Sequence, residues 1–426
     1  MSKLDRSHDP ARRSWVAGAD GHADFPIQNL PFAGSSGGVV VAIGNHALRL
    51  ADAIDAGLGT GLGLDAGLFR DPTLNRYLRG TSAGDWTALR LAISDALADA
   101  TWQPRLAPCL DPIDATVLQP AVTTRDYTDF YASIHHATNV GSMFRPDNPL
   151  LPNYKWIPIG YHGRGSTIVG DGTPIRRPAG QTRPAGDETP TVGPSRSLDY
   201  ELELGIIIGG ENAIGEVVPA SQAMDRIFGV VLLNDWSARD LQAWEYQPLG
   251  PFLAKNFAST VSNWLVTRDA LRPFEVPMPA RPTSDPHPLP YLQVPEDVTW
   301  SLDLAVDLAT AAMRDRGDAP FRVSSTRFAT SMYWSPAQLV THHASNGCAL
   351  LAGDLLGTGT VSGPAPEARG CLLERTWRGS EPLALPDGTD RRFLEDGDEV
   401  SLSGRAMGGG AIPIGLGPCR GIVQSG

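Results

Sequence analysis

The sequence predicts an α+β fold that is mainly β, with a small N-terminal domain followed by a large β-rich C-terminal domain. The 46 glycines and 36 prolines are scattered through apolar runs, a pattern typical of many short strands joined by tight turns. Only 19% of the 426 residues are charged, which indicates a chain that builds a core and excludes a disordered one. This length is enough for two or three domains, or for one small and one large domain.

The N-terminal part mixes helices with a short strand. Residues 1–13 are polar and basic, and we expect them to form a loose tail. Within the N-terminal domain, 14–120, the valine-rich run 38–43 predicts a strand, and apolar residues at helical spacing predict a helix over 85–100. The stretch 82–85, which precedes this helix, resembles a capping box.

A glycine-rich run at 57–63 invites comparison with dinucleotide-binding turns. It does not give the G-x-G-x-x-G spacing, and the residues before it do not form a strand that leads directly into the turn. We therefore expect a flexible surface loop here and not a nucleotide site.

After about residue 120 the pattern changes, and 121–426 is expected to form the large domain. Strand-like runs separated by Gly, Pro and Asn turns predict a β-rich structure, as at 206–208, 230–233 and 302–308. The proline-dense stretch 276–291 is expected to be an extended connection.

The charge balance and the cysteine pattern exclude several classes of partner. A net charge of −12 argues against nucleic acid or an anionic membrane, so we expect neither as a partner. The four cysteines lie far apart without a C-x-x-C pair, which favours a reducing compartment over a disulfide framework or a zinc site. Because the N-terminus lacks an apolar targeting segment and no run reaches the length of a membrane span, we expect a soluble, cytoplasmic protein.

Four carboxylates predict a metal site. Between residues 198 and 204 apolar side chains alternate with carboxylates, so in a strand Glu201 and Glu203 share one face while the leucines face the core. Like charges on one face repel each other unless a cation neutralises them. With Asp129 and Asp235, from two other short motifs, they would form an all-oxygen site that suits Mg²⁺ or Ca²⁺ and neither zinc nor copper.

Two pairs of adjacent histidines, His135-His136 and His342-His343, are further candidates. Neighbours in sequence diverge by about 100° on a helix, so neither pair can hold one ion as adjacent ligands. A histidine taken alone is more often packed or exposed than catalytic. His136 stands out because it follows Asp129 by seven residues, which would place both on one face if Asp129 opened a helix. An imidazole beside a metal-bound electrophile is a candidate general base.

The residues after Asp235 carry a polar helical pattern. Arg239, Gln242 and Tyr246 have i, i+3, i+7 spacing and so share a helix face, and Lys255 follows within twenty residues. One interpretation is a solvated polar face with an Arg–Asp pair. The other is a set of donors for a developing oxyanion, because a carboxylate at a strand end precedes them.

Several motifs in order resemble one known family. The main ones are DYTDFY at 126–131, HATNVG at 136–141, GYHGR at 160–164, NDWSARD at 234–240 and QPLGPFL at 247–253. Further matches are DFPIQNLP at 24–31, MYW at 332–334 and HHASNG at 342–347. Together they resemble the fumarylacetoacetase (fumarylacetoacetate hydrolase) family, from about residue 14 to the C-terminus.

The resemblance implies a fold and a set of site residues. It implies a small SH3-like barrel domain over 14–120, a large mixed β-roll domain over 121–426, and a homodimer. It makes Asp129, Glu201, Glu203 and Asp235 the metal ligands. It makes His136 the base and Glu374 the residue that orients it. Arg239, Gln242 and Lys255 would line the oxyanion site, and the residues that would hold substrate are Tyr131, Arg145, Tyr161, Gln242, Tyr246 and Thr360.

This chain departs from the family pattern at a few positions. A second Mg²⁺ site of the family matches Lys255 and Ser259, and at the latter position the family has Thr. Ala254 stands where the family usually has Gly, and the residues 134–135 before the base also differ. None of these differences removes a functional group.

The activity that the resemblance implies is hydrolysis of a carbon–carbon bond. The substrate would be the dicarboxylic diketo acid 4-fumarylacetoacetate, cleaved to fumarate and acetoacetate in the last step of tyrosine and phenylalanine (homogentisate) catabolism, with Mg²⁺ or Ca²⁺ as cofactor. Relatives that decarboxylate, hydrate or isomerise oxo-acids on a similar metal platform are one alternative. A metal-stabilised binding protein without catalysis is another, but it has no use for His136, Gln242 and Lys255.

Overall fold

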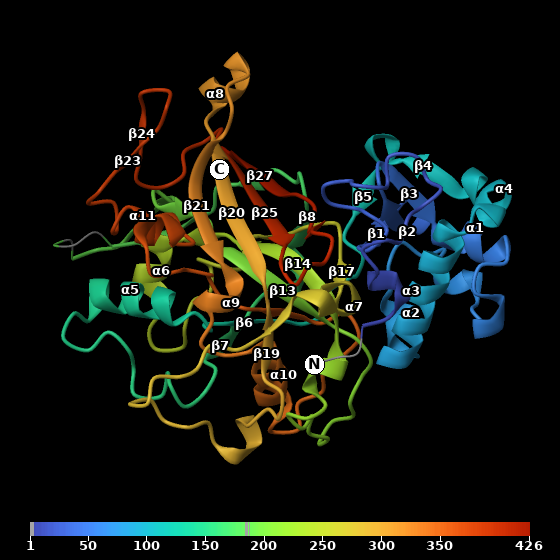
Figure 1. The fold of residues 1–426 in the computed structure, drawn as a ribbon. Coiled ribbons are helices and arrows are strands. Elements are labelled where there is room, and N and C mark those ends of the chain that lie inside the picture. Colours follow the sequence, from blue (N-terminus) through green and yellow to red (C-terminus); the bar gives the residue numbers. More distant parts are fainter. Residues whose placement is uncertain (1–3, 184–185, 187) are drawn as a thin grey trace.

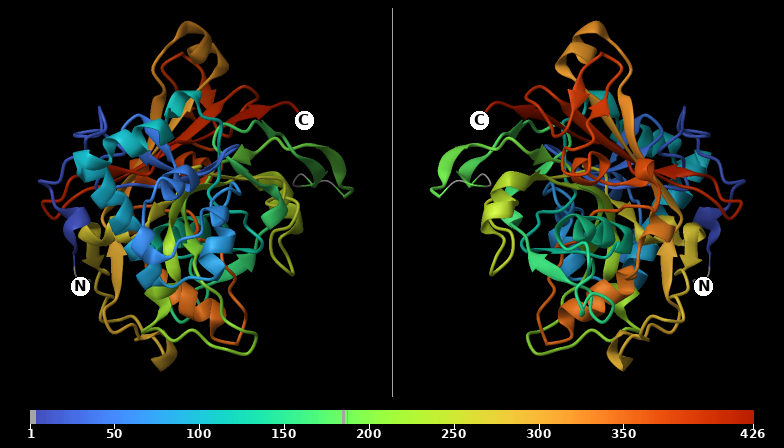
Figure 2. Two further views of the ribbon diagram at one scale, coloured as in Figure 1. Left: turned by 90° about the vertical axis from the view of Figure 1, so that its right-hand side faces the viewer. Right: turned by 90° about the vertical axis from the view of Figure 1, so that its left-hand side faces the viewer.

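The computed structural model describes residues 4–183, 186 and 188–426, and it combines helices with several β-sheets. Figure 1 shows the N-terminal elements on the right of the molecule and a larger body with long strands on the left. The two termini lie at opposite sides, and the β10–β11 hairpin projects from the body on the side of the C-terminus (Figure 2). Within the described part of the chain, the helices all lack the length and apolar character needed to cross a membrane.

The α-helices have the following bounds: α1 Leu50–Asp55, α2 Asn75–Arg79, α3 Ala83–Ala98, α4 Gln103–Leu106, α5 Ile134–Phe144, α6 Arg239–Glu245, α7 Arg268–Leu271, α8 Ala311–Arg316, α9 Phe328–Ser331, α10 Pro336–Ala344 and α11 Leu372–Arg375. The strands up to the middle of the chain are β1 Phe32–Ser35, β2 Gly38–Ile43, β3 His46–Arg49, β4 Leu110–Pro112, β5 Leu118–Gln119, β6 Tyr127–Phe130, β7 Gly160–His162, β8 Ile168–Gly170, β9 Ile175–Arg176, β10 Ala179–Thr182, β11 Thr191–Pro194, β12 Leu198–Asp199, β13 Leu202–Ile208 and β14 Ile227–Asp235. The later strands are β15 Ser237–Ala238, β16 Ser259–Val261, β17 Val266–Thr267, β18 Glu275–Pro277, β19 Val298–Trp300, β20 Leu302–Ala309, β21 Phe321–Arg327, β22 Leu355–Gly357, β23 Leu383–Ala384, β24 Asp390–Arg391, β25 Glu399–Ala406, β26 Ile414–Gly415 and β27 Cys419–Gln424.

The N-terminal part is built on one antiparallel sheet with helices packed on it. Among the described residues this sheet has five strands in the order β4-β3-β2-β1-β5. The predicted strand at 38–43 is confirmed as β2, all of whose residues are buried. The helix predicted over 85–100 is confirmed as α3, two residues earlier at each end. Its capping box is also present, because Asp85 Oδ2 accepts from Ser82 N at 2.8 Å.

The segment expected to be a loose tail makes specific contacts where the structure describes it. Arg6–His8 form a short 3₁₀ turn, and His8 Nε2 lies 2.7 Å from Asp269 O. Arg12 Nη2 donates to Asp95 Oδ1 on α3 at 2.6 Å. These contacts pair this segment with residues far along the chain, and local polarity alone gave no sign of them.

The segments 57–63 and 276–291 were expected to be a surface loop and an extended connection. The glycine-rich run 57–63 contains a 3₁₀ turn, Thr60–Leu62, flanked by Gly59 and Gly63 with φ of 64°. The proline-dense stretch 276–291 begins as an extended strand, since β18 pairs antiparallel with β19, and the rest is irregular up to a 3₁₀ turn at Pro290–Leu292.

The larger body contains two main sheets. In the described part of the chain, one sheet follows the order β7-β6-β22-β13-β14-β16-β8, with β17 beside β14, and the other follows β21-β20-β25-β27-β9, with β26 beside β25. The strand-like runs at 206–208, 230–233 and 302–308 are confirmed as parts of β13, β14 and β20.

Alternate residues of the central strands face opposite sides of the first sheet. Leu202, Leu204 and Ile206 of β13 belong to the larger core, whereas Ile207 belongs to a second core shared with the N-terminal part. Glu203 has the same parity along the strand as Ile207 and so projects on the second face. The prediction that the leucines of this strand face the core while its carboxylates face the other way is therefore confirmed.

Candidate active site

Four buried carboxylates meet at one point, as the sequence predicted. One oxygen from each of Asp129, Glu201, Glu203 and Asp235 lies within 4.8 Å of the corresponding oxygens of the others. All four side chains are buried. An arrangement of this kind is unfavourable for anions alone, since desolvation and like-charge repulsion both oppose it.

The register of the first sheet explains why these carboxylates meet. Asp129 in β6 pairs with Gly357 in β22, which in turn pairs with Gly205 in β13, two residues after Glu203. Asp235 is the last residue of β14, as expected for a strand-end carboxylate. A Cβ at Gly357 would lie 2.4 Å from Asp129 Oδ1, so the close approach of the carboxylates requires glycine there.

The helical placement expected for Asp129 is wrong. Asp129 lies in β6, a buried strand held between β22 and β7, and α5 begins only at Ile134. Ser133 is the N-cap of α5. Pairing on both sides of β6 overrides the helical spacing of 129 and 136. His136 therefore lies in the first turn of the helix that follows the strand.

Two cations contact the carboxylates. Lys255 Nζ donates to Glu201 Oε2 at 2.6 Å and to Asp235 Oδ2 at 2.7 Å, and Arg239 Nη1 is 2.7 Å from Glu201 Oε1. Burial alone would raise the pKa of Glu201, but the charges of Lys255, Arg239 and His136 lower it below its usual range. Burial opposes the charge of Lys255, yet Asp235 and Glu201 raise its pKa above the ordinary value, so its ammonium stays protonated.

Among the described residues, no cation pairs with the other two carboxylates, Asp129 and Glu203. Burial and the charge of Asp235 raise the pKa of Asp129 well above its ordinary value, and burial and the charge of Asp129 do the same for Glu203. The Gly359 N–H donates to both, at 3.2 Å to Asp129 Oδ1 and 3.0 Å to Glu203 Oε2. Among the described residues, the buried oxygen Glu203 Oε1 has no hydrogen-bond partner.

This donor set fits a divalent cation. Arg239 also pairs with the buried Asp199, so among the described residues these two cations do not balance the four carboxylates of the cluster, and a buried oxygen is still free to coordinate. Oxygen-only donors are the ligands of hard cations such as Mg²⁺ and Ca²⁺. The observed cluster thus supports the metal site that the sequence predicted.

A histidine–carboxylate pair lies on two helices that pack side by side. His136 on α5 and Glu374 on α11 are buried, and His136 Nδ1 is 2.6 Å from Glu374 Oε2. Burial alone would raise the pKa of Glu374, but the charge and hydrogen bond of His136 lower it to about 2. An ionised carboxylate can only accept, so Nδ1–H is the donor and Nε2 is the basic nitrogen.

Three further donors hold Glu374, and the sequence did not point to any of them. Ser362 Oγ donates to Glu374 Oε2 at 2.8 Å, Asn139 Nδ2 donates to Oε1 at 2.8 Å, and Cys371 Sγ lies 3.2 Å from Oε2. Asn139 lies on the same helix as His136. The carboxylate is therefore fixed from several directions, and with it the tautomer of His136.

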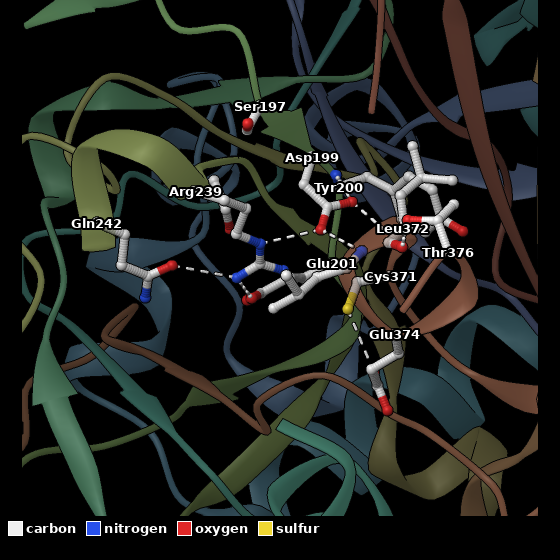
Figure 3. A network of polar contacts seen from close by, with 12 residues as sticks. Ser197, Asp199, Tyr200, Glu201, Arg239, Gln242, Cys371, Leu372, Glu374 and Thr376 are labelled. Atoms are coloured by element: carbon white, nitrogen blue, oxygen red, sulfur yellow. Dashed lines mark hydrogen bonds and ion pairs between the residues drawn. The ribbon is translucent and has the colours of Figure 1, made fainter. Parts of the chain in front are cut away.

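The polar helix after Asp235 is present as α6, but its arginine does not pair as the solvated-face interpretation requires. Arg239 is buried, and its Nε donates to Asp199 Oδ2 at 2.9 Å, while Nη1 donates to Gln242 Oε1 at 3.3 Å (Figure 3). Asp240 instead accepts from Ser195 Oγ at 2.6 Å. Arg239 Nη2 is a buried donor without a partner among the described residues, which leaves it available to a ligand.

The residues predicted to hold substrate fall into two groups. Tyr161 OH donates to Asp235 Oδ2 at 2.7 Å. The rings of Tyr131 and His136 meet edge-on, with their centroids 5.1 Å apart. Tyr161 thus contacts the cluster and Tyr131 contacts the histidine, while Thr360 is buried.

The second group lies at the surface. Arg145 follows α5 on an exposed loop, where its Nη2 donates to Pro149 O at 3.2 Å. Tyr246 is the C-cap of α6 and is 41% exposed. The structure thus brings the first group to the cluster and leaves these two side chains in solvent.

Ser259 and Lys255 both adjoin Asp235, where the second metal site was expected. Ser259 Oγ donates to Asp235 Oδ1 at 2.8 Å, and the strand register pairs these two residues. Because Lys255 Nζ is protonated it donates and cannot coordinate a metal, so a metal contact from this residue would have to use its backbone carbonyl.

Asp199 is a buried residue with several polar contacts to which the sequence analysis gave no role. It accepts hydrogen bonds from Arg239 and from the backbone of α11. It stands at i, i+2, i+4 spacing with Glu201 and Glu203, and this spacing was a signal that could have identified it.

The comparisons with known proteins point to one family. A family model described as fumarylacetoacetate (FAA) hydrolase C-terminal matches residues 126–424. The chain is 46% identical to the fumarylacetoacetase of Caenorhabditis elegans over 417 residues, which cover 94% of this chain and 97% of the relative. It is 45% identical to the fumarylacetoacetase of Homo sapiens over 414 residues, covering 94% and 96%. For that of Arabidopsis thaliana the identity is 44% over 422 residues, covering 95% and 96%.

Solved structures share the fold at lower identity. A fumarylacetoacetate hydrolase from psychrophilic Exiguobacterium antarcticum superposes with a TM-score of 0.50 at 16% identity, covering 93% of this chain and all of that one (100%). A maleylpyruvate hydrolase from Sphingobium sp. SYK-6, in complex with manganese(II) ion and pyruvate, gives the same TM-score of 0.50 at 19% identity and covers 93% and 100%. With near-complete coverage of relatives above 40% identity and the family match over 126–424, the chain belongs to the fumarylacetoacetate hydrolase family.

Proposed function

We propose that this protein hydrolyses the carbon–carbon bond of 4-fumarylacetoacetate, giving fumarate and acetoacetate, the last step of tyrosine and phenylalanine catabolism. The observation that carries the proposal is that one chain combines the carboxylate cluster with the buried His136–Glu374 pair and matches fumarylacetoacetases along nearly its whole length. A metal-stabilised binding protein would have no use for a histidine whose tautomer is fixed by an ionised carboxylate.

The residues that would hold the metal are Asp129, Glu201, Glu203 and Asp235, with a second ion near Lys255 and Ser259. Mg²⁺ or Ca²⁺ is proposed because the donors are oxygens only. When bound, a divalent cation supplies Lewis-acid polarisation of the two diketone oxygens.

His136 acts as the general base. With Nδ1–H held by Glu374, the free Nε2 takes a proton from a water molecule. The water oxygen bonds to a carbonyl carbon of the diketone, the bond to the neighbouring carbon breaks, and the proton ends on that departing carbon. The two products are fumarate and acetoacetate.

The donors around the cluster stabilise the negative charge that develops on the attacked oxygen. Arg239 carries the unpartnered buried Nη2, Lys255 carries a protonated ammonium, and Gln242 contacts Arg239. Such donors act most strongly in a site with little water. Tyr131, Tyr161 and Thr360, together with Arg145 and Tyr246 on the flanking loops, are proposed to hold the substrate and its carboxylates.

The finer architecture is also a proposal. Residues 14–120 form an SH3-like barrel domain and 121–426 a β-roll domain, with 1–13 before them; the antiparallel N-terminal sheet supports the first assignment. We further propose a cytoplasmic homodimer. Light scattering on the purified protein should give twice the 45.4 kDa chain mass, and a monomer mass would contradict the dimer.

The function is tested by incubating purified protein and metal with 4-fumarylacetoacetate and analysing for fumarate. Equal amounts of fumarate and acetoacetate are expected. Carbon dioxide release would indicate a decarboxylase, an isomer of unchanged mass would indicate an isomerase, and unreacted substrate would leave only the binding-protein alternative.

A further inference from the structure

Asp199 links the two halves of the proposed catalytic machinery. Its side chain is fully buried, and it contacts both Arg239 and the segment that carries Glu374. We infer that Asp199 is a positioning residue that fixes the Arg239 guanidinium and the start of α11 relative to each other. The inference rests on the proposed function for its consequence in catalysis, but its geometry stands independently.

The Asp199 carboxylate is saturated with donors. Oδ1 accepts from Tyr200 N at 2.9 Å and from Leu372 N at 2.8 Å. Oδ2 accepts from Leu373 N at 2.9 Å and from Arg239 Nε at 2.9 Å. With two donors on each oxygen, the carboxylate plane has one orientation that satisfies all four bonds.

This orientation sets the direction of the Arg239 head. Nε is held by Asp199 while Nη1 contacts Glu201 Oε1 at 2.7 Å, so the planar guanidinium is fixed at two points (Figure 3). The third nitrogen, Nη2, is the buried donor without a partner among the described residues. Loss of the Asp199 contact would leave the head held only at Nη1, which contacts Glu201 and Gln242, and free to rotate about that nitrogen. Nη2 would then no longer be held in place.

The second half of the link runs through α11. Leu372 and Leu373, whose N–H groups bind Asp199, directly precede Glu374. Figure 3 shows Leu372 beside Asp199 and Glu374 further along the same segment. Glu374 in turn accepts from His136 Nδ1. A shift of this short helix would therefore move the carboxylate away from the imidazole. Small displacements of this kind can lower a rate by about 10²-fold even when every reacting group is present.

The backbone alone does not provide this link. Strands β12 and β15 pair Asp199 with Ser237, and Arg239 N donates to Ser197 O at 2.9 Å, so the chain segments at residues 199 and 239 are adjacent in any case. Those bonds position main chain only. The Asp199 side chain is what reaches the Arg239 head and α11, 173 and 174 residues further along the chain at Leu372 and Leu373.

The substitution Asp199→Asn tests the link with almost no change in volume. Each Asp199 oxygen accepts from two N–H groups. In either orientation of the asparagine amide, its NH₂ group therefore replaces one accepting oxygen and lies against two donors with which it cannot form a hydrogen bond. We expect kcat to fall by about 10- to 100-fold at saturating metal, with KM within about threefold of wild type. The matched control is Asp240→Asn. It removes a carboxylate next to Arg239 that accepts from Ser195 Oγ, Arg196 N and Leu241 N, and it should change kcat by less than about threefold.

A double-mutant cycle separates positioning from a general structural role. Because one arm of the link runs through Arg239 and the other through α11, Asp199→Asn should lower kcat by a clearly smaller factor in an Arg239→Met background than in the wild type. A full multiplicative loss in that background would overturn the inference. Urea unfolding of the same four proteins provides a second readout, where we expect a coupling of at least about tenfold in the unfolding equilibrium constant. If the wild type releases no fumarate, the proposed function fails, and the unfolding cycle still decides the inference.

A variant with Asp199 intact keeps the test decisive if Asp199→Asn does not fold. Arg239→Lys retains the positive charge. Lysine has a single nitrogen, so it cannot donate to Asp199 through a separate Nε while its ammonium contacts Glu201. At least about a tenfold loss of kcat is expected, with metal affinity measured by titration to confirm saturation. A kcat equal to that of wild type would overturn the inference.

Discussion

Replacing Glu374 by glutamine tests whether the reaction needs a charged partner for His136. In the native protein the pKa of Glu374 falls from 4.5 to about 2, because the charge and hydrogen bond of His136 outweigh the effect of burial. That difference of about 2.5 units is worth roughly 3 kcal/mol of preference for the ionised carboxylate, or a factor of about 300.

Glutamine keeps the shape and one acceptor oxygen but loses this charge. If its oxygen stays where Glu374 Oε2 was, the bonds from His136 and Ser362 persist, and the new NH₂ faces Asn139, whose amide can turn to accept. The fold should therefore survive. We expect kcat to fall by about 10- to 300-fold, since the imidazolium that forms during proton transfer loses its counter-charge.

The same variant has a predicted effect on stability against pH. Because the native pKa of Glu374 is below the unfolded value of 4.5, the unfolded chain binds more protons in this range, and stability rises with pH. The contribution is complete above about pH 4.5 and is lost as the pH falls towards about 2. Glu374→Gln should therefore lower the urea midpoint at pH 7. Between about pH 4.5 and 2, the midpoint of the variant should fall less steeply with decreasing pH than that of the wild type.

The assay is a pH–rate profile for fumarate release at saturating metal, with unfolding followed by circular dichroism. Glu395→Gln is the control, because that carboxylate is 65% exposed and pairs only with Arg391 at 3.3 Å among the ion pairs found in the described chain. It should leave kcat within about twofold. A Glu374→Gln enzyme with wild-type kcat across the pH–rate profile would refute the reasoning.

Four further perturbations have expected outcomes. His136→Ala should lower kcat by about 10²–10⁴-fold with a much smaller change in KM, measured by steady-state kinetics; near-normal turnover would place the base elsewhere, with His135 the first alternative. Exhaustive chelation should abolish activity, and Mg²⁺ or Ca²⁺ should restore it; full activity in protein shown metal-free by elemental analysis would exclude the metal role. Lys255→Met should depress kcat by roughly 10²–10³-fold, whereas Arg145→Met, on the exposed loop, should mainly raise KM; at saturating metal, a Lys255→Met variant altered in KM alone would make Lys255 a substrate anchor.

Local patterns in the sequence were enough for the elements that depend on near neighbours. The alternation in 198–204 predicted that Glu201 and Glu203 share a face, because side chains in a strand alternate between the two faces of a sheet. Helix α3 and its cap were predictable since the capping box and helical spacing act within one or two turns. The oxygen-only donor set of the proposed metal site followed from residue chemistry alone.

Only the tertiary structure decided which distant groups meet. The helical spacing of Asp129 and His136 was misleading because β6 pairs on both sides, with β7 and with β22, and β22 lies more than two hundred residues away. His136 and Glu374 are 238 residues apart, and no local pattern links them; the family resemblance alone named the pair. The hydrogen bonds that Asp199 accepts from Arg239 and from α11 depend on how β12, α6 and α11 pack together. Periodicity determines which face of an element a side chain occupies, whereas sheet register and helix packing determine what that face meets.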